Sequence, residues 1–483
     1  MSNTIKTRFA PSPTGYMHIG NLRTALYSYL LSKSQGGKFI LRIEDTDQER
    51  LVEGATDVII KTLEMTGIDY DEGPGVGGEN GPYIQSERLP IYKEYAEQLV
   101  KSGHAYYCFC TPERLESLKD DKGIGGYDGH CRDLSAEEIE KNLSEGKPYV
   151  IRQRMPDEGT TSYVDLVYGE VVMDNSELRD QIMIKADGYP TYNFCHVVDD
   201  HLMGVTHVVR GNEYLTSTPK YCLLYDAFGW ERPNYVHLPL LMGKDEDGNV
   251  SKLSKRHGAV SFQDLVNDGY LPEAIVNYIA LLGWCPKDTN QEFFTMDELK
   301  ENFSIEGLSK SPAVFDYEKL KWFNSEYIKK LPDDEYNEKV LPILNELCED
   351  YINTKKLGEL LHTRISSFSE IKDQVKFVTS RLEMTDDLYT NKKNKTTPEL
   401  CKGILEDCLP KLREVSDWNN DTLFALLKDY SAEKELKAGA VMWAVRVAIA
   451  RQGITPGGAT ELMEVFGKDE TVSRIEQAIN ELQ

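Results

Sequence analysis

Residues 10–21 form a stretch whose residue types suit the binding of a phosphate group. The run reads Ala-Pro-Ser-Pro-Thr-Gly-Tyr-Met-His-Ile-Gly-Asn, and its prolines and glycines predict a loop. A short strand is expected before it, over residues 4–9, and an amphipathic helix after it, because apolar residues recur at helical spacing from Leu22 to Leu30. The start of such a helix offers unpaired backbone N–H groups and a positive dipole end to an anion. His18, just before the helix, can donate a hydrogen bond to a phosphate oxygen.

A second candidate for phosphate chemistry lies far downstream, in the run Lys252-Leu-Ser-Lys-Arg256. It ends a polar stretch, residues 244–256, that begins acidic and finishes basic, which predicts a mobile loop. The fingerprints GxGxxG and GxxxxGK[ST] are both absent. A lone His-x-Gly is usually a turn and a lone KLSKR is usually a solvated loop, but the two together with the Pro-Ser-Pro-Thr-Gly run favour one shared site.

The two motifs resemble the HIGH and KMSKS signatures of class I aminoacyl-tRNA synthetases, in the form used by the glutamyl and glutaminyl enzymes. Asn21 stands at the last position of the first signature, and residues 188–203 also resemble the glutamyl subfamily. The resemblance implies a glutamate–tRNA ligase that uses ATP and Mg²⁺, with tRNA(Glu) and L-glutamate as substrates. His18 and Lys255 would stabilise the charge on the transferring phosphoryl group from opposite sides. The ATP-binding residues implied are Pro11, Thr14, Gly15, His18, Gly20, Asn21, Lys252, Ser254, Lys255 and Arg256.

Two arginines are candidates for binding a carboxylate. Arg8 and Arg210 each lie at the carboxyl end of an expected strand, and such ends line the ligand crevice of an open sheet. An arginine there is more often a surface ion-pair partner, but two that flank one crevice would call for an anion between them. We hypothesise that Arg210 selects glutamate over glutamine by charge. The glutamate-binding residues that the resemblance implies are Arg8, Ser12, Glu44, Tyr192, Arg210 and either Asn193 or His196, with Glu44 holding the amino group.

Cys108, Cys110, His130 and Cys131 have the residue types of a structural zinc site, although Cys-x-Cys is a tight spacing. In zinc-bearing members of the family a Cys-x-Cys pair is completed by a later Cys-x-His. Here the second pair reads Cys131-x-Asp133, with His130 on the other side of Cys131. The fourth ligand would be Asp133 or His130, and buried thiols without metal remain the alternative.

The elements that position these residues predict an α/β catalytic core, a doubly wound (Rossmann-like) parallel sheet with an α+β insertion, followed by an all-α anticodon-binding region. Arg364 aligns with an arginine that some family members use against an anticodon base, although a solvated helix arginine is the commoner case. The expected parts are the first half of the catalytic domain at 1–105, an insertion that grips the tRNA acceptor end and carries the possible zinc site at 106–185, the second catalytic half at 186–256, a stem-contact region at 257–330, and a helical anticodon-binding domain at 331–483.

Composition limits the class of protein. A chain of 483 residues with 40% hydrophobic and 10% aromatic residues is globular and long enough for several domains. The N-terminus lacks a secretory apolar segment and no apolar run approaches a membrane span, so we expect no membrane partner. Nine scattered cysteines suit a reducing cytosol, which predicts a cytoplasmic protein. Taken alone, the net charge of −25 argues against a nucleic-acid partner. Local basic patches could still bind tRNA, so we expect tRNA contacts only on a few faces of the protein.

Other readings remain open at this stage. A glutaminyl enzyme would carry β-barrels at its C-terminus, where this chain predicts helices. A short glutamyl-queuosine ligase would end after the catalytic core. Two alternatives come from a different functional class: an adenylyl-transferring enzyme that does not use tRNA, and an ATP-binding scaffold protein. Only the acidic net charge of the chain favours them. The sequence leaves open whether tRNA(Gln) is also charged; we expect a monomer.

Overall fold

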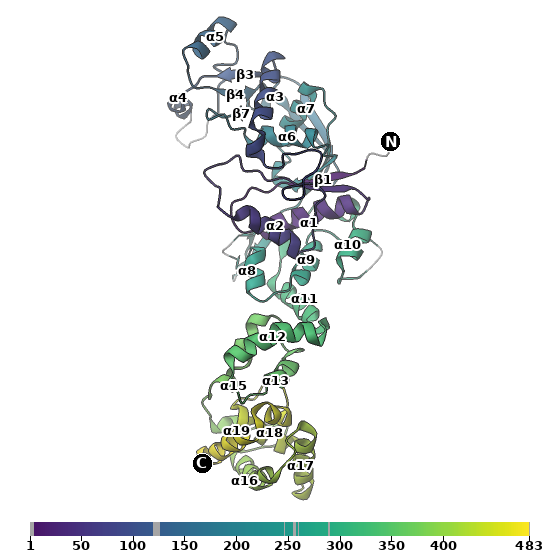
Figure 1. Cartoon of the computed structure of the whole chain (residues 1–483), viewed down its shortest axis with the longest axis vertical. Helices are drawn as coiled ribbons and strands as arrows, with labels where there is room; N and C mark the ends of the chain where they lie inside the picture. Colours follow the sequence, from purple (N-terminus) through teal and green to yellow (C-terminus); the bar gives the residue numbers. More distant parts are fainter. Residues whose placement is uncertain are drawn as a thin grey trace. The chain divides into compact units, whose positions relative to one another are not determined.

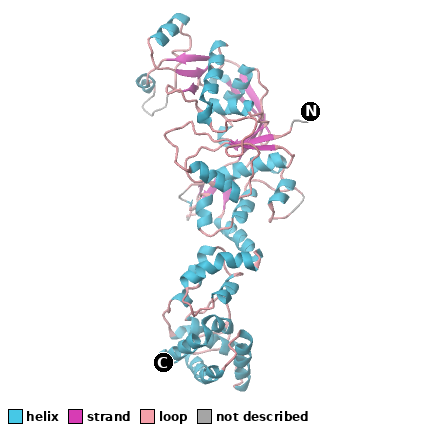
Figure 2. Cartoon of the chain, in the orientation of Figure 1, coloured by secondary structure: helices cyan, strands magenta, loops and turns pink. Residues whose placement is uncertain are grey.

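The computed structural model describes residues 4–118, 126–245, 247–254, 257–258, 260–287 and 290–482. The chain divides into two compact units. The first comprises Met1–Leu265 and Ile275–Asp316, and the second comprises Val266–Ala274 and Tyr317–Gln483. Figure 1 labels their elements, and Figure 2 shows that the strands belong to the first unit.

A parallel βαβ unit opens the first compact unit. Strand β1 (Lys6–Phe9), helix α1 (Ile19–Lys33) and strand β2 (Lys38–Leu41) follow one another, and Arg8 pairs with Ile40 in the parallel ladder. The loop between β1 and α1 is the proline- and glycine-rich stretch, as the sequence predicts. Gly37 directly precedes β2, and a Cβ there would lie 2.0 Å from the Ile5 carbonyl oxygen, so only glycine fits.

A second parallel strand pair forms the other half of the core of the first unit. Strand β8 (His207–Gly211), helix α7 (Thr218–Phe228) and strand β9 (Asn234–Leu238) lie in a sheet of order β6-β5-β9-β8. The hairpin of β5 (Thr160–Asp165) and β6 (Gly169–Asp174) joins this sheet through one parallel pair, Asp165 with Tyr235. Helix α6 (Tyr192–Leu202) precedes β8 and buries Phe194, Val197 and Val198 in the core.

Two smaller sheets and several helices surround this core. One sheet is antiparallel and consists of β3 (Ala105–Cys108), β4 (Val150–Gln153) and β7 (Ile182–Ile184). The other consists of β10 (Leu241–Lys244), β11 (Val250–Lys252) and β12 (Ala313–Phe315). The remaining helices up to residue 302 are α2 (Ala55–Met65), α3 (Leu89–Lys101), α4 (Pro112–Ser117), α5 (Ala136–Ser144), α8 (Phe262–Asn267), α9 (Pro272–Ala280) and α10 (Met296–Asn302).

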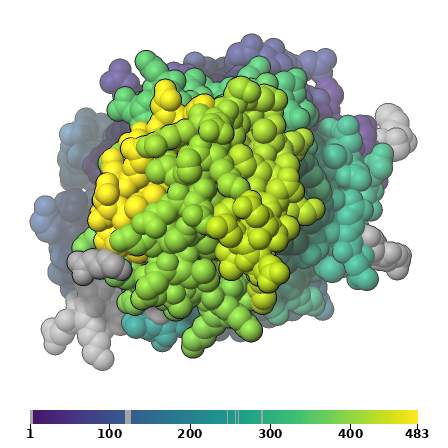
Figure 3. Space-filling view, turned by 90° about the horizontal axis from the view of Figure 1, so that it is seen from below, coloured from purple at the N-terminus to yellow at the C-terminus, as the bar shows by residue number. Residues whose placement is uncertain are grey.

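Among the described residues of the second unit the named regular elements are all helices, which confirms the predicted change of pattern. Its helices are α11 (Tyr317–Lys330), α12 (Asp333–Leu347), α13 (Thr354–Leu361), α14 (Ile371–Gln374), α15 (Lys376–Thr379), α16 (Pro398–Glu414), α17 (Asn420–Glu433), α18 (Ala438–Ala450) and α19 (Ala459–Glu481). Figure 3 shows the surface that the last helices, coloured from yellow-green to yellow, form together. Val441, Ala444, Val445 and Ala448 of α18 are fully buried in one core, so the helical spacing read from the sequence marks a real buried face.

One core prediction is wrong. Trp284 and Phe323 are buried as expected, but Trp322, which the sequence suggested as a core aromatic, keeps 43% of its surface exposed. Adjacent residues of a helix point in different directions, and α11 turns Phe323 rather than Trp322 inward. None of the described helices is long and apolar enough to cross a membrane.

Candidate active site

A cavity of about 1100 Å³ lies in the first unit, at the carboxyl ends of β1 and β8. It gathers most of the residues singled out in the sequence. Those that line it are Arg8, Pro11, Ser12, Thr14, His18, Gly20, Asn21, Glu44, Tyr192, Arg210 and Lys252. Gly15, Asn193, His196 and Ser254 are not among its lining residues, and Lys255 and Arg256 lie outside the described part of the chain.

His18 is fixed at the start of α1 in one tautomer. It is the N-cap residue of the helix, and its Nδ1 accepts a hydrogen bond from the Gly20 backbone N–H at 3.0 Å. The ring proton must therefore reside on Nε2. Burial, and then the charge of Lys252, lower the pKa of His18, which keeps the ring neutral. The residue thus presents one N–H donor toward an anion, and a Cβ at Gly20 would crowd this ring at 3.3 Å.

The second signature begins at the edge of the same cavity. Lys252 ends β11, is exposed, and lines the cavity. Beyond it, the Ser254 N–H donates to His257 Nδ1 at 3.1 Å, and His257 Nε2 lies 3.0 Å from the Ser251 hydroxyl oxygen. The buried His257 therefore links the backbone of Ser254 to the side chain of Ser251 within the described part of this loop.

Arg8 is buried and already has a counter-ion. Its Nε donates to Asp200 Oδ1 at 3.0 Å, and its Nη1 donates to the Val209 carbonyl at 3.2 Å. Asp200 also accepts from Arg42 at 2.8 Å. Arg8 therefore does not by itself call for a ligand anion, because α6 supplies an acid that the sequence alone did not place beside it. Its place in the amino-acid pocket stays a prediction.

Arg210 differs, because all of its direct partners are uncharged. Its Nε donates to His237 Nε2 at 3.1 Å, and its Nη2 donates to the Thr218 hydroxyl at 2.7 Å. Nη1 lies 3.4 Å from His196 Nε2. No carboxylate of a described residue comes within 4.0 Å of the guanidinium, although its side chain is almost fully buried. A buried cation without an acid in a cavity wall is a place for a ligand anion.

Two further predicted residues line the same cavity, Glu44 and Tyr192. The buried Glu44 accepts through Oε1 from Arg42 Nη2 at 2.9 Å. Burial raises the pKa of Glu44, and Arg42 opposes that shift. Tyr192 stacks on His196 with ring centroids 4.6 Å apart, and burial raises its pKa.

The alternative between Asn193 and His196 gains a geometric distinction. His196 touches Arg210, whereas Asn193 accepts a hydrogen bond from the Tyr221 hydroxyl at 2.6 Å. Burial and the charge of Arg210 lower the pKa of His196 to about 3, so the ring is neutral at pH 7.

Several residues beside Arg210 were not singled out in the sequence. The ring centroids of Tyr214 and Tyr221 lie 5.0 and 4.9 Å from the guanidinium carbon of Arg210. Thr218 and His237 accept hydrogen bonds from the guanidinium. These residues come from α7, β9 and the turn after β8, which are far from the two signatures. No motif marks them, and only the closing of the sheet brings them together.

Three of the four expected metal ligands gather near β3. The ligand atoms of Cys108, Cys110 and Cys131 all lie within 4.8 Å of one another, and the Cys110 and Cys131 sulfurs are 3.6 Å apart. Neither His130 nor Asp133 belongs to this group of described residues. His130 is exposed, and Asp133 pairs with Arg154 at 3.1 Å while its side chain is 85% exposed.

Tyr127 lies beside these thiols. Its hydroxyl accepts from the Cys131 backbone N–H at 2.8 Å and also hydrogen-bonds with Cys108. Burial and the Cys131 thiol raise the pKa of Cys110 to about 12.

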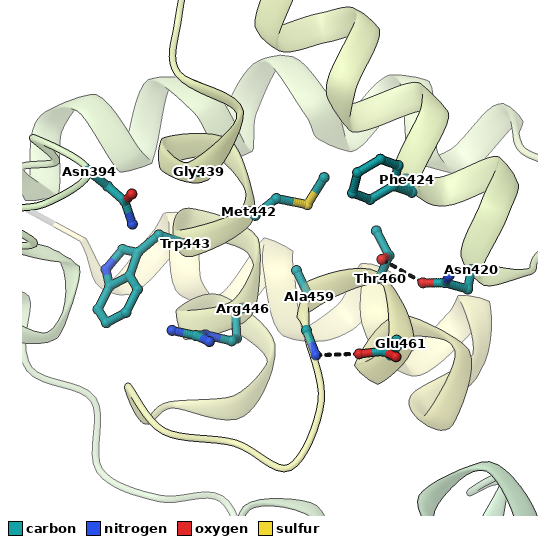
Figure 4. Close-up of a pocket in the computed structure, with 11 residues that line it drawn as sticks. Asn394, Asn420, Phe424, Gly439, Met442, Trp443, Arg446, Ala459, Thr460 and Glu461 are labelled. Carbon is teal, nitrogen blue, oxygen red and sulfur yellow. Dashed lines mark hydrogen bonds between the residues drawn. The ribbon is translucent and has the colours of Figure 1, made fainter. Parts of the chain in front are cut away.

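A second cavity, of about 430 Å³, lies in the helical unit (Figure 4). Trp443 and Arg446 of α18 line one side of it, and the Arg446 guanidinium carbon is 4.8 Å from the Trp443 ring centroid. Arg446 Nε is buried without a hydrogen-bond partner. Asn420 and Thr460 face each other across a 2.7 Å hydrogen bond. Arg364 lies elsewhere, exposed in the turn after α13.

Comparison with known protein families divides the chain in a similar way. Residues 4–322 match the family described as tRNA synthetases class I (E and Q), catalytic domain. Residues 317–479 match the family described as anticodon binding domain.

Individual relatives match over the full length. A glutamate–tRNA ligase of Clostridium novyi is 56% identical over 99% of this chain and 98% of its own, and one of Clostridium kluyveri is 54% identical over 99% and 98%. The crystal structure of a glutamate tRNA ligase from Elizabethkingia meningosepticum, in complex with its amino acid, superposes with a TM-score of 0.88 at 35% identity, over 99% of this chain and 100% of that one. These matches confirm the predicted fold class: a Rossmann-like catalytic domain followed by a helical anticodon-binding domain. The chain belongs to the glutamate–tRNA ligases, within the glutamyl and glutaminyl group of class I tRNA synthetases.

Proposed function

We propose that this chain joins L-glutamate to the 3′ end of tRNA(Glu) in two steps, and that the large cavity of the first unit is where both steps occur. In the first step an oxygen of the glutamate α-carboxylate attacks the α-phosphorus of ATP, and diphosphate leaves. In the second, a hydroxyl of the terminal tRNA adenosine attacks the carbonyl carbon of the adenylate, and AMP leaves. The carboxylate is ionised at pH 7, so the first step needs no general base.

Binding of the amino acid is assigned to the wall around Arg210. Its guanidinium would take the side-chain carboxylate, and Glu44 would accept from the ammonium group. Ser12, Tyr192 and Arg8 would complete this pocket, with His196 preferred over Asn193 because it touches Arg210. The observation that carries the proposal is the absence of any acidic partner for Arg210 among the described residues, which favours glutamate over the neutral glutamine.

Stabilisation of the transferring phosphoryl group is assigned to the two signatures. The Nε2–H of His18 would donate to a phosphate oxygen, and Lys252, Lys255 and Arg256 would bring positive charge from the other side. The other ATP-binding residues that we propose are Pro11, Thr14, Gly15, Gly20, Asn21 and Ser254. Mg²⁺ would arrive with ATP, held mainly by phosphate oxygens, and would neutralise their charge.

Contacts with tRNA are assigned by parts of the chain. We propose that the insertion at 106–185 binds the acceptor end of the tRNA and that residues 257–330 contact its stem. The helical unit would bind the anticodon. The cavity lined by Trp443 and Arg446 suits an unpaired base, because an indole and a guanidinium both stack on bases and Arg446 Nε has no partner. Arg364, exposed and in none of the described ion pairs, is a second candidate for a base contact.

A structural zinc ion is proposed at Cys108, Cys110 and Cys131. Tetrahedral zinc with thiolate ligands sets sulfur atoms about 3.8 Å apart, close to the 3.6 Å found for Cys110 and Cys131. The Tyr127 hydroxyl fits the fourth position better than His130 or Asp133, because it alone of the three contacts the thiols. Zinc here would stabilise the fold of the insertion and take no part in the reaction.

The first test is ATP–diphosphate exchange. With tRNA(Glu) present, glutamate should support exchange and glutamine should not, and in this subfamily the reaction is expected to require tRNA. Equal exchange with the two amino acids would contradict the assignment of Arg210. We further propose a cytosolic monomer, which light scattering after gel filtration tests by its mass relative to 54.9 kDa.

A further inference from the structure

Three buried side chains form a hydrogen-bonded series that ends at Arg210. Asp165 on β5, His237 on β9 and Arg210 on β8 are 1%, 0% and 4% exposed. His237 Nδ1 lies 2.6 Å from Asp165 Oδ2, and Arg210 Nε lies 3.1 Å from His237 Nε2. The acid is thus one imidazole away from the arginine and does not touch it.

The contacts determine where the imidazole carries its proton. A carboxylate oxygen only accepts, so the proton of the short Asp165–His237 contact resides on Nδ1. Nε2 then keeps its lone pair and accepts from Arg210. Burial lowers the pKa of His237, which favours this neutral form.

Asp165 is itself held firmly by the backbone. Its Oδ1 accepts from the Val167 and Tyr168 N–H groups at 2.9 and 2.8 Å, and its Oδ2 accepts from the His237 N–H at 3.1 Å. The carboxylate cannot rotate without the loss of these bonds, so it sets the orientation of the imidazole as well as its tautomer.

We propose that Asp165 and His237 are positioning residues for substrate selection: they aim Arg210 into the cavity while its charge stays available to the side-chain carboxylate of glutamate. The inference rests on the proposed role of Arg210. The partners of the guanidinium N–H groups are all neutral: His237, His196 and Thr218, and also the Tyr192 hydroxyl, which itself lines the cavity. The charge of Arg210 is thus left for a carboxylate. An acid in direct contact with Arg210 would compete with the substrate, whereas an acid behind an imidazole holds the geometry without that competition.

Two substitutions at one position separate positioning from mere filling of space. In His237→Asn the amide nitrogen can still donate to Asp165, but the acceptor for Arg210 is lost. In His237→Gln the longer amide can offer an oxygen to Arg210, while the contact with Asp165 is lost. His207→Gln, on the neighbouring strand β8 and outside the cavity lining, is the control.

The readouts are the KM for glutamate, kcat, the KM for ATP and the ratio of glutamate to glutamine use. We expect His237→Asn to raise the KM for glutamate about ten- to a hundredfold, with less effect on kcat and none on the KM for ATP. We expect His237→Gln to recover only part of that loss, because it restores the acceptor for Arg210 while Asp165 no longer orients the side chain. Equal effects of the two variants, or none in either, would overturn the positioning role.

A double variant and a spectrum complete the test. In an Arg210→Gln background, His237→Asn should have no further effect on the KM for glutamate, and a persisting effect would overturn the inference. If Arg210→Gln alone keeps a normal KM, the proposed function of Arg210 fails instead. Should the His237 variants not fold, ¹⁵N NMR of the histidine-labelled wild type decides: protonated Nδ1 with bare Nε2 supports the inference, and protonated Nε2 overturns it.

Discussion

Arg8 and Arg210 line the same cavity, but their surroundings give them different roles. Arg8 forms a buried ion pair with Asp200, whereas Arg210 has only neutral partners among the described residues. Removing one member of an isolated buried pair costs about 3–5 kcal/mol of folding free energy; Asp200 keeps Arg42 at 2.8 Å, so the loss of Arg8 should cost less than that. Removing Arg210 leaves no such acid behind, so its loss should appear in substrate binding.

Replacement of Arg210 by glutamine should therefore raise the KM for glutamate by about a hundredfold or more and reduce discrimination against glutamine. The unfolding temperature should change little. Arg8→Gln is the matched comparison, and it should lower the unfolding temperature by several degrees because Asp200 loses a partner. Steady-state kinetics with both amino acids and a thermal melt make both measurements; an Arg210→Gln enzyme with unchanged glutamate kinetics would place this arginine outside the pocket.

Lys255 carries the second prediction at this scale. Lys255→Ala should lower turnover by about 10²–10³-fold with the fold intact, as expected when a charge contact made in the transition state is lost. Circular dichroism checks the fold, and single-turnover adenylate formation checks the step. Near-normal turnover would remove Lys255 from the mechanism.

Residue types with special chemistry could be read from the sequence; their partners could not. His18 and Lys252 were identifiable because they sit in short, dense motifs, and the structure places both on one cavity. Asp200 and His237 were not, since each reaches its arginine only through the packing of elements separated in the sequence. Contacts of high sequence separation leave no local pattern to detect.

At the scale of elements, the cysteine cluster depends on β3 and the loops around it. Cys108 ends β3, so the Cys-x-Cys pair leaves the strand directly and turns back toward Cys131. The existence of the cluster followed from residue types, but its fourth partner did not: the sequence drew attention to His130 and Asp133, whose backbone positions leave them exposed. Tyr127 has no metal-ligand signature and becomes visible only through its contacts.

Zinc content tests this element. Purified protein should hold about one zinc per chain, and Cys110→Ser should lose it together with several degrees of thermal stability. Cys285→Ser, at an exposed free cysteine away from the cluster, should keep both. If a metal-free preparation has full activity and stability, the three cysteines are buried thiols that bind no metal. Tyr127→Phe should weaken zinc retention more than Asp133→Asn if the tyrosine is the fourth ligand.

The helical unit carries a prediction for tRNA. Arg446→Gln and Arg364→Gln should each raise the KM for tRNA(Glu) about tenfold with the KM for glutamate unchanged, because base contacts of this kind are worth about 1–3 kcal/mol. Arg413→Gln, which removes only a surface ion pair with Glu476, should have no effect. Unchanged tRNA kinetics in Arg446→Gln would exclude the cavity of Figure 4 as a base-binding site, and the same result in Arg364→Gln would exclude that arginine.

For the whole molecule, the sequence predicted the class of architecture well. Helical spacing alone indicated the all-α second unit, and the βαβ order indicated the parallel core. The division of strands among sheets was harder, because the β5–β6 hairpin joins the β8–β9 sheet through a single pair, Asp165 with Tyr235, that no periodicity marks. That same pair brings Asp165 to the strand that carries His237.

The net charge of −25 also acts on the whole molecule. A net negative charge repels tRNA except at local basic positions, so binding should rest on few phosphate contacts. Charge alone could not decide the partner, since it reports the average surface and recognition depends on a few sites.

Aminoacylation tests the central account most directly. The wild-type chain is incubated with ATP, labelled glutamate and either purified tRNA(Glu) or purified tRNA(Gln), with and without excess unlabelled glutamine. Labelled glutamate should appear on tRNA(Glu) and should not be displaced by glutamine, and the tRNA(Gln) reaction decides whether the enzyme discriminates between the two tRNAs. The absence of labelled tRNA(Glu), or its loss when glutamine is added, would contradict the account.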